Sequence, residues 1–415
     1  MVDNVKHLKT WLIWLGQRQN SVLWEASVES ARFYNETIAY YRKAFDAKEK
    51  PTMRGAYDAV KGLNRVLLHS QTAQASRENA TLAVKAFFAS LKRYKKSSNG
   101  FSGKPKFPHH VKHIFALTFK KSAIRVKNGN IVLSMKKGKP CVIVPWKKDL
   151  PTPGMVKIRM DRGKWKACVI LEDKREPVKT DEKKVMSVDL GVKRLATTFD
   201  GKDSLIISGK PILSLNRLAA KNSGKRSTFL KRFKVGSRKH RRAKRSFNNQ
   251  SRKIDNLKRD FLHKTSRALV NVCHTKGIGK IVFGDCAGTH TEPNVGKTNN
   301  QKVSSGCEQK FRKCVTHKFS GVTGLVPEHY TSQTCPVCAQ RKKSNSRAWK
   351  CDCGFTCDRD WLGAFNIYNV SLGTFGKPNL QRSGDLATPR GLRFDVDSSY
   401  CKPSIVPVTE RTPDF

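Results

Sequence analysis

Two closely spaced pairs of cysteines have the residue type and spacing of a structural zinc site. The pairs, Cys335–Cys338 and Cys351–Cys353, are about a dozen residues apart. Thiolates on two adjacent knuckles can surround Zn²⁺ tetrahedrally, and bound zinc would replace the hydrophobic core that so short a segment cannot form. The second pair is one residue shorter than usual, which leaves Cys357 as an alternative ligand. We predict that the zinc ligands are Cys335, Cys338, Cys351 and Cys353.

The distribution of cysteines along the chain argues against a disulfide scaffold. Five of the twelve cysteines fall between Cys335 and Cys357, and the others are scattered singly. Clustered cysteines in a basic chain are typical of a metal site in a reducing compartment. Reduced thiols without a metal are the alternative interpretation.

Two aspartates lie where a carboxylate could take part in catalysis. Asp189 ends an apolar stretch and precedes Leu-Gly, and Asp360 begins an expected helix just after the second cysteine pair. Converging carboxylates can hold two Mg²⁺ ions ~3.5–4 Å apart, of which one activates water and the other stabilises the leaving oxygen. Oxygen ligands suit Mg²⁺ and thiolates suit zinc, so the two sites are distinct. Considered singly, each aspartate is better explained as a turn or helix cap.

The net charge indicates a polyanionic partner. Among 415 residues, 82 Lys and Arg stand against 32 Asp and Glu, a difference of +50. Such charge repels itself unless a polyanion neutralises it, and nucleic acid gains affinity by releasing counterions. A ribosomal-type or merely adhesive basic protein is the alternative on charge alone. No apolar run reaches the ~18–20 residues of a membrane span, and Trp11–Leu15 is too short for a secretion signal. We therefore predict no membrane partner.

The elements that must position these residues divide the chain into helical and strand segments. Residues 20–95 have apolar side chains at helical spacing. Residues 113–171 alternate as strands do, with Asn128-Gly129 and Asp161–Gly163 as hairpin turns. The alternation predicts a small antiparallel barrel or sandwich.

The second half of the chain has the element order of an RNase H-like fold. Three strands, a helix and a further strand are expected at 185–191, 195–199, 205–207, 252–274 and 280–286. Residues 209–250 are very basic and weakly apolar, and either line a nucleic-acid channel or form a solvated, partly disordered loop. The predicted nucleic-acid-binding residues are Lys239, Arg241, Arg242, Lys244 and Arg245. Residues 372–415 are predicted to be a disordered tail.

Three segments of the sequence resemble the TnpB family, which is related to type V CRISPR effectors and to Fanzor proteins. They are Val188-Asp-Leu-Gly-Val, Glu328-His-Tyr-Thr-Ser-Gln-Thr-Cys-Pro-Val-Cys and Cys353-Gly-Phe-Thr-Cys-Asp-Arg-Asp-Trp-Leu-Gly-Ala-Phe-Asn-Ile. Weaker matches extend the resemblance over about residues 20–370. The sequence departs from the family pattern at Ala339 and Leu362, and the family's opening strand is not evident near the N-terminus.

The resemblance implies a RuvC nuclease that uses Asp, Glu and Asp. Asp189 matches the first position and Asp360 the third. Many relatives carry the Glu at the end of the fourth strand, where this sequence has Gly284 followed by Asp285. A branch of the family instead carries it before the Tyr-Thr-Ser motif, which is the place of Glu328. We therefore predict Glu328 as the second carboxylate, with Asp285 in reserve.

The resemblance also implies a domain layout within an α+β multidomain fold. A helical recognition domain (1–100) precedes a β-barrel wedge domain (101–180), and a RuvC-like, RNase H-like nuclease domain (181–330 and 358–371) is interrupted by a zinc ribbon (331–357). The implied function is RNA-guided, Mg²⁺-dependent cleavage of double-stranded target DNA beside a short adjacent motif, with a guide RNA from the protein's transposable element. A cytoplasmic, nucleoid-associated place in a prokaryotic or phage host is expected. The alternatives are a non-cleaving, RNA-guided repressor or transposon accessory protein, and a strand-transferring transposase.

Overall fold

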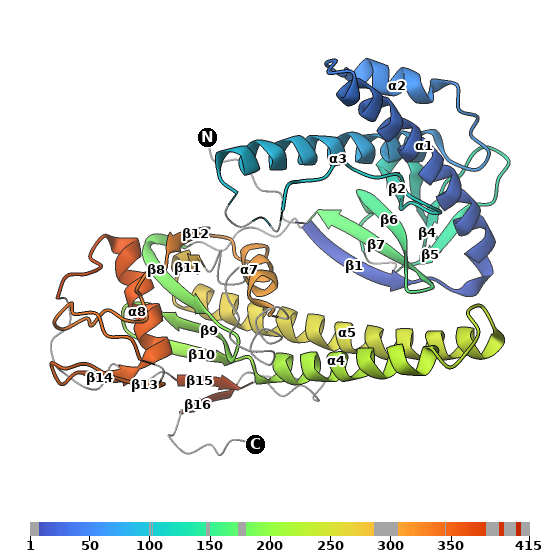
Figure 1. Ribbon diagram of the computed structural model, residues 1–415. Helices are drawn as coiled ribbons and strands as arrows, with labels where there is room; N and C mark the ends of the chain where they lie inside the picture. The colour runs from blue at the N-terminus through green and yellow to red at the C-terminus, as the bar shows by residue number, and fades with distance from the viewer. Residues whose placement is uncertain are drawn as a thin grey trace. The chain divides into compact units, whose positions relative to one another are not determined.

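The computed structural model divides into two compact units, Met1–Arg175 and Glu176–Phe415 (Figure 1). The structure describes residues 8–98, 101, 103–146, 150–172, 180–285, 306–344, 346–378, 390–393 and 404–407. Each unit is described by itself below. The predicted α+β class is confirmed, since both units combine helices with strands.

Unit 1 contains the predicted helical segment as three helices, α1 (Asn20–Asp46), α2 (Met53–Lys61) and α3 (Ser70–Lys96). Glu29 of α1 is buried, and its carboxylate accepts hydrogen bonds from the backbone N–H groups of Val66 and Leu67 at 2.9 and 2.7 Å. These bonds fasten the connection between α2 and α3 to α1, and they satisfy a charge that would otherwise be costly to bury.

The strands of unit 1 form two antiparallel sheets, and no closed barrel is seen among its described residues. One sheet has the order β1-β7-β6-β2 and the other β3-β4-β5. Their bounds are β1 (Leu8–Trp14), β2 (Leu117–Lys120), β3 (Ile124–Lys127), β4 (Asn130–Leu133), β5 (Val142–Pro145), β6 (Met155–Asp161) and β7 (Lys164–Glu172), with short 3-10 turns at Gln17–Gln19 and Lys121–Ala123. The barrel interpretation is therefore wrong for this chain.

The opening strand that the sequence did not reveal is present. β1 runs antiparallel to β7, from Leu8 opposite Glu172 to Trp14 opposite Lys166. The two hairpin turns are where the sequence predicts them: Asn128 and Gly129 have φ of 49° and 69°, the left-handed values of the tight turns that join twisted antiparallel strands. Pairing of β1 with a strand some 150 residues away leaves no local sequence signal, because only β7 determines it.

Unit 2 is built on a seven-stranded sheet of order β12-β11-β8-β9-β10-β15-β16. Strands β8 (Asp181–Leu190), β9 (Arg194–Phe199) and β10 (Ser204–Ser208) form an antiparallel meander. After helices α4 (Lys210–Leu230) and α5 (Arg238–Thr275), β11 (Ile278–Asp285) runs parallel to β8. Helix α7 (Glu308–Thr316) leads to β12 (Val322–Pro327), which runs parallel to β11. The first four strands thus have the element order that the sequence predicts.

Both faces of this sheet are covered, and alternation along β8 separates the two packing layers. Met186 and Val188 join the hydrophobic cluster that includes Leu269 of α5 and Phe311 of α7. On the opposite face, Val185 packs with residues of β11 and of helix α8 (Arg359–Leu372). Successive side chains of a strand point to opposite faces, so Asp189 shares the α8 face.

The basic segment is helical, not a disordered loop. α4 and α5 pack side by side (Figure 1), and α5 begins at Arg238, well before the predicted start of its helix. Its N-cap Ser237 accepts a hydrogen bond from the N–H of His240 at 3.1 Å. Phe229 of α4 contacts Phe247 of α5 with ring centroids 6.0 Å apart, which holds the distal part of the pair together.

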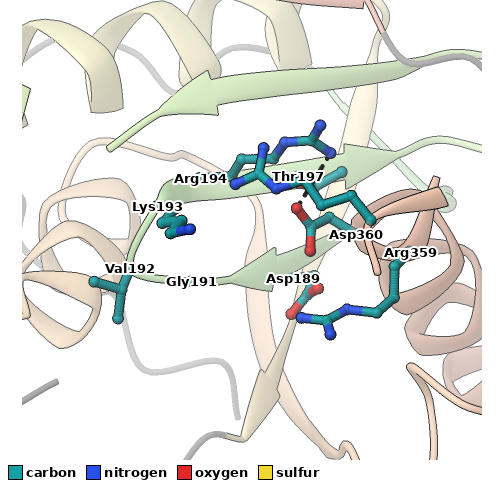
Figure 2. A pocket seen from close by; sticks show the side chains of 9 residues that line it. Asp189, Gly191, Val192, Lys193, Arg194, Thr197, Arg359 and Asp360 are labelled. Carbon is teal, nitrogen blue, oxygen red and sulfur yellow. Dashed lines mark ion pairs between the residues drawn. The ribbon is translucent and has the colours of Figure 1, made fainter. Parts of the chain in front are cut away.

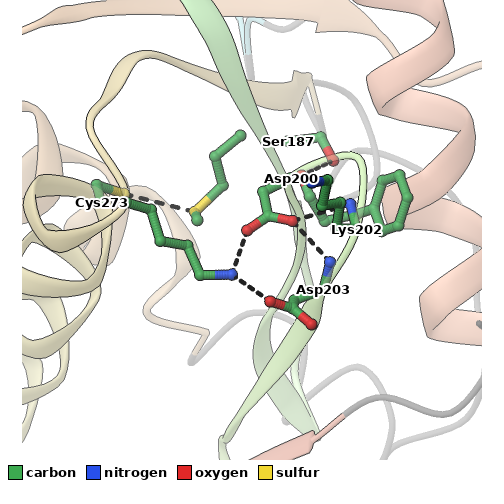
Figure 3. Close-up of polar contacts among 8 residues, drawn as sticks. Ser187, Asp200, Lys202, Asp203 and Cys273 are labelled. Carbon is green, nitrogen blue, oxygen red and sulfur yellow. Dashed lines mark hydrogen bonds and ion pairs between the residues drawn. The ribbon is translucent and has the colours of Figure 1, made fainter. Parts of the chain in front are cut away.

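A polar network fixes the turn between β9 and β10 to the end of α5 (Figure 3). The carboxylate of Asp200 accepts hydrogen bonds from the N–H groups of Lys202 and Asp203, at 3.0 and 2.7 Å. Lys276, which follows α5, pairs with Asp200 and with Asp203, the latter at 2.7 Å. The network ties the strand meander to the end of the long helix.

Two strands lie within the predicted disordered tail. β15 (Arg390–Arg393) runs parallel to β10, and β16 (Ser404–Pro407) runs antiparallel to β15. The prediction of disorder is wrong for these two strands, whose composition gives no signal because the sheet edge supplies their partner. Most of the remaining tail lies outside the described residues.

Candidate active site and metal centre

Three parallel strands bring acidic residues to one edge of the unit 2 sheet. β8 pairs with β11 up to Val188 opposite Phe283, and β11 pairs with β12 up to Asp285 opposite Pro327. Asp189 follows Val188, and Glu328 follows Pro327 directly. The carboxyl ends of parallel strands meet at the same edge, where α/β sheets place their functional groups. Residues 139 positions apart in sequence are therefore neighbours.

Gly284 leaves the space that the Glu328 carboxylate occupies. A Cβ atom at Gly284 would lie 2.5 Å from Glu328 Oε2 and 2.8 Å from Ile367 Cδ1. Val282 packs on the α8 face, and alternation puts position 284 on that face too. A carboxylate from Glu328 thus reaches the place where a side chain from the end of β11 would point. The exposed Asp285 lies at the end of β11. Burial raises the pKa of Glu328, and the charge of Asp285 raises it further.

Helix α8 positions Asp360 beside Asp189. The side chain of Asp358 caps this helix by accepting hydrogen bonds from the N–H groups of Asp360 and Trp361, at 2.9 and 3.3 Å. Gly363, one turn further on, allows close approach: a Cβ there would lie 2.5 Å from Asp189 Oδ2. The hydroxyl of Ser187 donates to the Ala364 carbonyl at 2.7 Å and locks α8 onto β8.

The carboxylates at this edge influence one another electrostatically. Burial raises the pKa of Asp189 well above its ordinary value, and the charges of Asp360 and Glu328 raise it further, against an opposing effect of Arg359. Burial, followed by the charge of Asp285, also raises the pKa of Glu328. Like charges that share a partly buried site disfavour the ionised form. A divalent cation would relieve this repulsion.

Asp189 and Asp360 line a pocket of about 340 Å³ that also has a strongly basic wall (Figure 2). The cationic side chains that line it are Lys193, Arg194, Arg347 and Arg359. Arg194 Nη1 lies 2.5 Å from Asp358 Oδ1 and 3.1 Å from Asp360 Oδ2, so it fixes the start of α8 against β9. Sequence reasoning missed these arginines, because one more basic residue carries no signal in so basic a chain.

The donor set at this edge fits Mg²⁺, which prefers carboxylate oxygens. Among the described residues, no group of three acidic side chains has carboxylate oxygens that all lie within 4.8 Å of one another. Carboxylates that share a pair of ions need not touch, since the ions themselves lie ~3.5–4 Å apart. Asp189, Glu328 and Asp360 are thus the candidate ligands for divalent cations at this edge.

The four predicted cysteines come together as a group that could hold a metal ion. The sulfur atoms of Cys335, Cys338, Cys351 and Cys353 all lie within 4.8 Å of one another. The Cys335–Cys353 and Cys338–Cys351 sulfur pairs are 3.7 and 3.5 Å apart, close to the separation of about 3.8 Å that four sulfurs ~2.3 Å from one zinc would have. These thiols fit structural zinc, and the shortened second pair does not prevent it.

Cys357, the alternative ligand, lies outside this group. It sits on β14 (Thr356–Asp358), which pairs with β13 (Ala348–Lys350) so that Cys357 is opposite Trp349. Its side chain is buried in the cluster of Trp349 and Trp361, and burial raises the pKa of its thiol. Cys357 is thus a core residue that joins the ribbon to α8.

A buried asparagine links the Glu328 segment to the helix that carries Asp360. Asn366 Nδ2 donates to the carbonyls of Thr331 and Thr334, at 2.6 and 2.8 Å. Thr331 in turn donates its hydroxyl to the Glu328 carbonyl at 2.9 Å. Sequence reasoning did not single out Asn366, although an amide inside an otherwise apolar helix face is a usable signal.

The predicted nucleic-acid-binding residues lie near the start of α5 and do not line the pocket that contains Asp189 and Asp360. Lys239, Arg241, Arg242, Lys244 and Arg245 are all exposed. Arg241 Nε donates to the Gly236 carbonyl at 2.7 Å, which braces the α4–α5 connection. Over the residues that the structure describes, no helix combines the length and apolar character needed to cross a membrane.

Two parts of this chain match known family models, and known proteins resemble it over longer stretches. Residues 167–289 match the family OrfB_IS605, described as "Probable transposase", and residues 309–367 match the family "Cas12f1-like, TNB domain". A Streptomyces pristinaespiralis protein named "Putative RNA-guided DNA endonuclease" is 26% identical over 75% of this chain and 71% of its own length. Escherichia coli InsQ, with the same description, is 26% identical over 55% of this chain and 59% of its own length.

A solved structure shares the fold. The chain aligns with Cas12f1 in the structure of a "Cas12f1-sgRNA-target DNA complex" at a TM-score of 0.53 and 13% identity, covering 86% of this chain and 84% of that one. The fold thus resembles that of Cas12f1. The two family matches and the named relatives support a relationship of this chain to the TnpB family.

Proposed function

We propose that the protein is an RNA-guided DNA endonuclease of RuvC type, in which Asp189, Glu328 and Asp360 bind Mg²⁺. The observation that carries the proposal is the fit between Gly284 and Glu328, because the carboxylate of Glu328 occupies the space over Gly284 at the end of β11, the strand next to β8. The names of the relatives support the same class of activity. The raised pKa values of Asp189 and Glu328 support a site that needs added positive charge.

Mg²⁺ ions bound by these carboxylates would supply an activated water and stabilise the leaving oxygen of a phosphodiester. The chain's own residues align the site. Arg194 holds Asp360 at the start of α8, and Ser187 holds α8 on β8. Glu328 is kept in place by the turn that Asn366 anchors.

The basic wall of the pocket gives the phosphate backbone a place to bind. Lys193 and Arg347 are exposed residues that line the pocket, and Arg359 lies beside Asp189 (Figure 2). Guanidinium groups can bind phosphate oxygens through two parallel hydrogen bonds. We infer that these side chains orient the cleaved strand, while the carboxylates bind the metal ions.

The partners that we propose are a guide RNA and double-stranded target DNA beside a short adjacent motif. Base pairing between guide and target would provide sequence specificity, while the protein reads only the motif and the shape of the duplex. The exposed basic residues at the start of α5 are suited to the RNA backbone, since each neutralised phosphate releases counterions. The four cysteines would hold a structural zinc ion.

The test is cleavage of DNA that matches the RNA copurifying with the full chain. We expect cutting with Mg²⁺, none with EDTA, and a loss of about a hundredfold or more for Asp189→Ala. Asp58→Ala is the matched control, because Asp58 is an exposed carboxylate in unit 1 whose ion pair with Arg54 contributes little. Matched binding without cutting in Mg²⁺ would instead support a silent, RNA-guided repressor. Joined transposon ends among the products would support a transposase.

A further inference from the structure

An aromatic side chain in a left-handed backbone conformation lies two residues after Glu328. Tyr330 has φ of 63°, and its side chain is 51% exposed. The left-handed region is unfavourable for a bulky residue and persists only where the surroundings enforce it. Tyr330 belongs to none of the hydrophobic clusters formed by the described residues. Packing in the core therefore does not explain why a tyrosine stands here.

The turn that carries Tyr330 is held rigidly. The Tyr330 carbonyl accepts hydrogen bonds from the N–H groups of Gln333 and Thr334, at 3.0 and 3.1 Å, and from the Thr334 hydroxyl at 3.0 Å. Asn366 fixes the same turn from α8 through the carbonyls of Thr331 and Thr334. These bonds hold the backbone in place, while the ring remains outside the core.

The ring is stacked on a cation from the first zinc knuckle. The guanidinium carbon of Arg341 lies 4.1 Å from the centroid of the Tyr330 ring. Arg341 is itself exposed, and it is held opposite Thr334 by a β-bridge. A guanidinium over an aromatic face is attracted by the ring quadrupole. Together, Tyr330 and Arg341 form a flat, preorganised and solvent-accessible surface beside the acidic edge.

We propose that Tyr330, backed by Arg341, is a stacking platform for an unpaired nucleobase of the strand being cut. The assignment deepens the proposed nuclease function and rests on it for the identity of the strand. Two residues of chain span at most about 7 Å, so the Cα of Tyr330 lies within that distance of the Cα of Glu328. A base that stacks on the ring would hold its neighbouring phosphate near the carboxylates. Stacking on aromatic side chains is tolerant of sequence, as guide-directed cleavage requires.

The test separates the platform from catalysis. Single DNA strands that match the copurifying RNA, with 2-aminopurine at successive positions, are titrated with the full chain and that RNA, without Mg²⁺ and without a chelator, and quenching of the fluorescent base reports stacking. Tyr330→Asn is the principal variant, because asparagine tolerates the left-handed conformation and removes the ring. Tyr330→Phe keeps the ring, and Tyr57→Ala removes an exposed tyrosine of unit 1 that also lies under arginines.

We expect quenching at one position or two adjacent positions with the wild type, with Tyr330→Phe and with Tyr57→Ala, and none with Tyr330→Asn. Affinity for single strands should fall roughly tenfold to a hundredfold in Tyr330→Asn, and an abasic nucleotide at the quenched position should weaken the wild type but not that variant. Equal quenching and equal affinity in Tyr330→Asn and the wild type would overturn the platform. Failure of the wild type to cut with Mg²⁺, with quenching intact, would reject the nuclease proposal alone.

Discussion

The fit between Gly284 and Glu328 gives a quantitative prediction about where the second carboxylate originates. In Gly284→Ala, the added methyl carbon would lie 2.5 Å from Glu328 Oε2. Ordinary van der Waals contact needs about 3.4 Å or more, so the carboxylate must move by about 1 Å. A displacement of this size in a preorganised site can cost ~100-fold in rate. We expect a comparable loss of cleavage by Gly284→Ala at saturating Mg²⁺.

The assay is single-turnover cleavage of guide-matched DNA, together with thermal unfolding. Gly324→Ala is the matched control, since Gly324 lies on the neighbouring strand β12 and a Cβ there would meet no atom within 4 Å. The decisive variant is Gly284→Glu combined with Glu328→Ala, which returns the carboxylate to the end of β11. We expect this double variant to cut faster than Glu328→Ala, which should lose about 10²–10³-fold.

Two results would refute the reasoning. Wild-type cleavage by Gly284→Ala, with Glu328→Ala inactive, would show that the space at Gly284 is not needed. Wild-type cleavage by Glu328→Ala would remove Glu328 from the mechanism and direct attention to Asp285, whose charge acts on the same region.

Further tests concern the buried aspartate, the turn anchored by Asn366, the four cysteines and the cations of α5. Because the pKa of Asp189 is raised in the folded, metal-free protein, its carboxyl keeps a proton at pH values where the unfolded chain has released it. The free energy of unfolding should therefore fall as pH rises from about 4 to the pKa of the folded state. The total loss is about 1.4 kcal/mol for each unit by which the two pKa values differ. Asp189→Asn should consequently melt at a higher temperature than the wild type at neutral pH in EDTA, and a lower one would contradict this. Asn366→Leu removes two buried hydrogen bonds and should lower the free energy of unfolding by about 2–4 kcal/mol. It should also raise the Mg²⁺ concentration needed for half-maximal cleavage. An unchanged Mg²⁺ dependence would limit Asn366 to a structural role. Cys338→Ser should reduce bound zinc, measured by elemental analysis, from one equivalent to nearly none, and full retention would remove Cys338 from the ligand set. Replacing Lys244 and Arg245 by Ala should lower the slope of log affinity for RNA against log salt by about 1–2, whereas an unchanged slope would show that neither contacts phosphate.

Local sequence patterns predicted the elements whose stability comes from their own residues. Alternation and turn residues located β3 and β4 around Asn128-Gly129, and the cysteine spacing identified the four thiols that meet. The family models and the named relatives support the resemblance to the TnpB family that the motifs indicate. In each case the signal lies within a short segment, as it does for hairpins and metal knuckles.

Elements that depend on distant partners were not predictable in the same way. β1 was not recognised because it pairs with the distant strand β7. β12 was not recognised either. Its residues are exposed or partly exposed, and its place at the sheet edge depends on pairing with β11. The length of α5 was underestimated because its N-terminal part has cations on most sides and little apolar periodicity. The contact between Glu328 and the space over Gly284 is visible only once β8, β11 and β12 are side by side.

The junction between the cysteine-rich segment, Cys335–Cys357, and α8 determines where this chain can tolerate added length. Asp358 is the last residue of β14 and also the cap of α8, so no linker separates the two elements. One residue inserted after Asp358 would turn Asp360 by about 100° around the helix axis and carry its carboxylate away from β8. An insertion between the two cysteine pairs, ahead of Arg347 and of β13 (Ala348–Lys350), would leave this junction unchanged. Added length should therefore be better tolerated there than after Asp358.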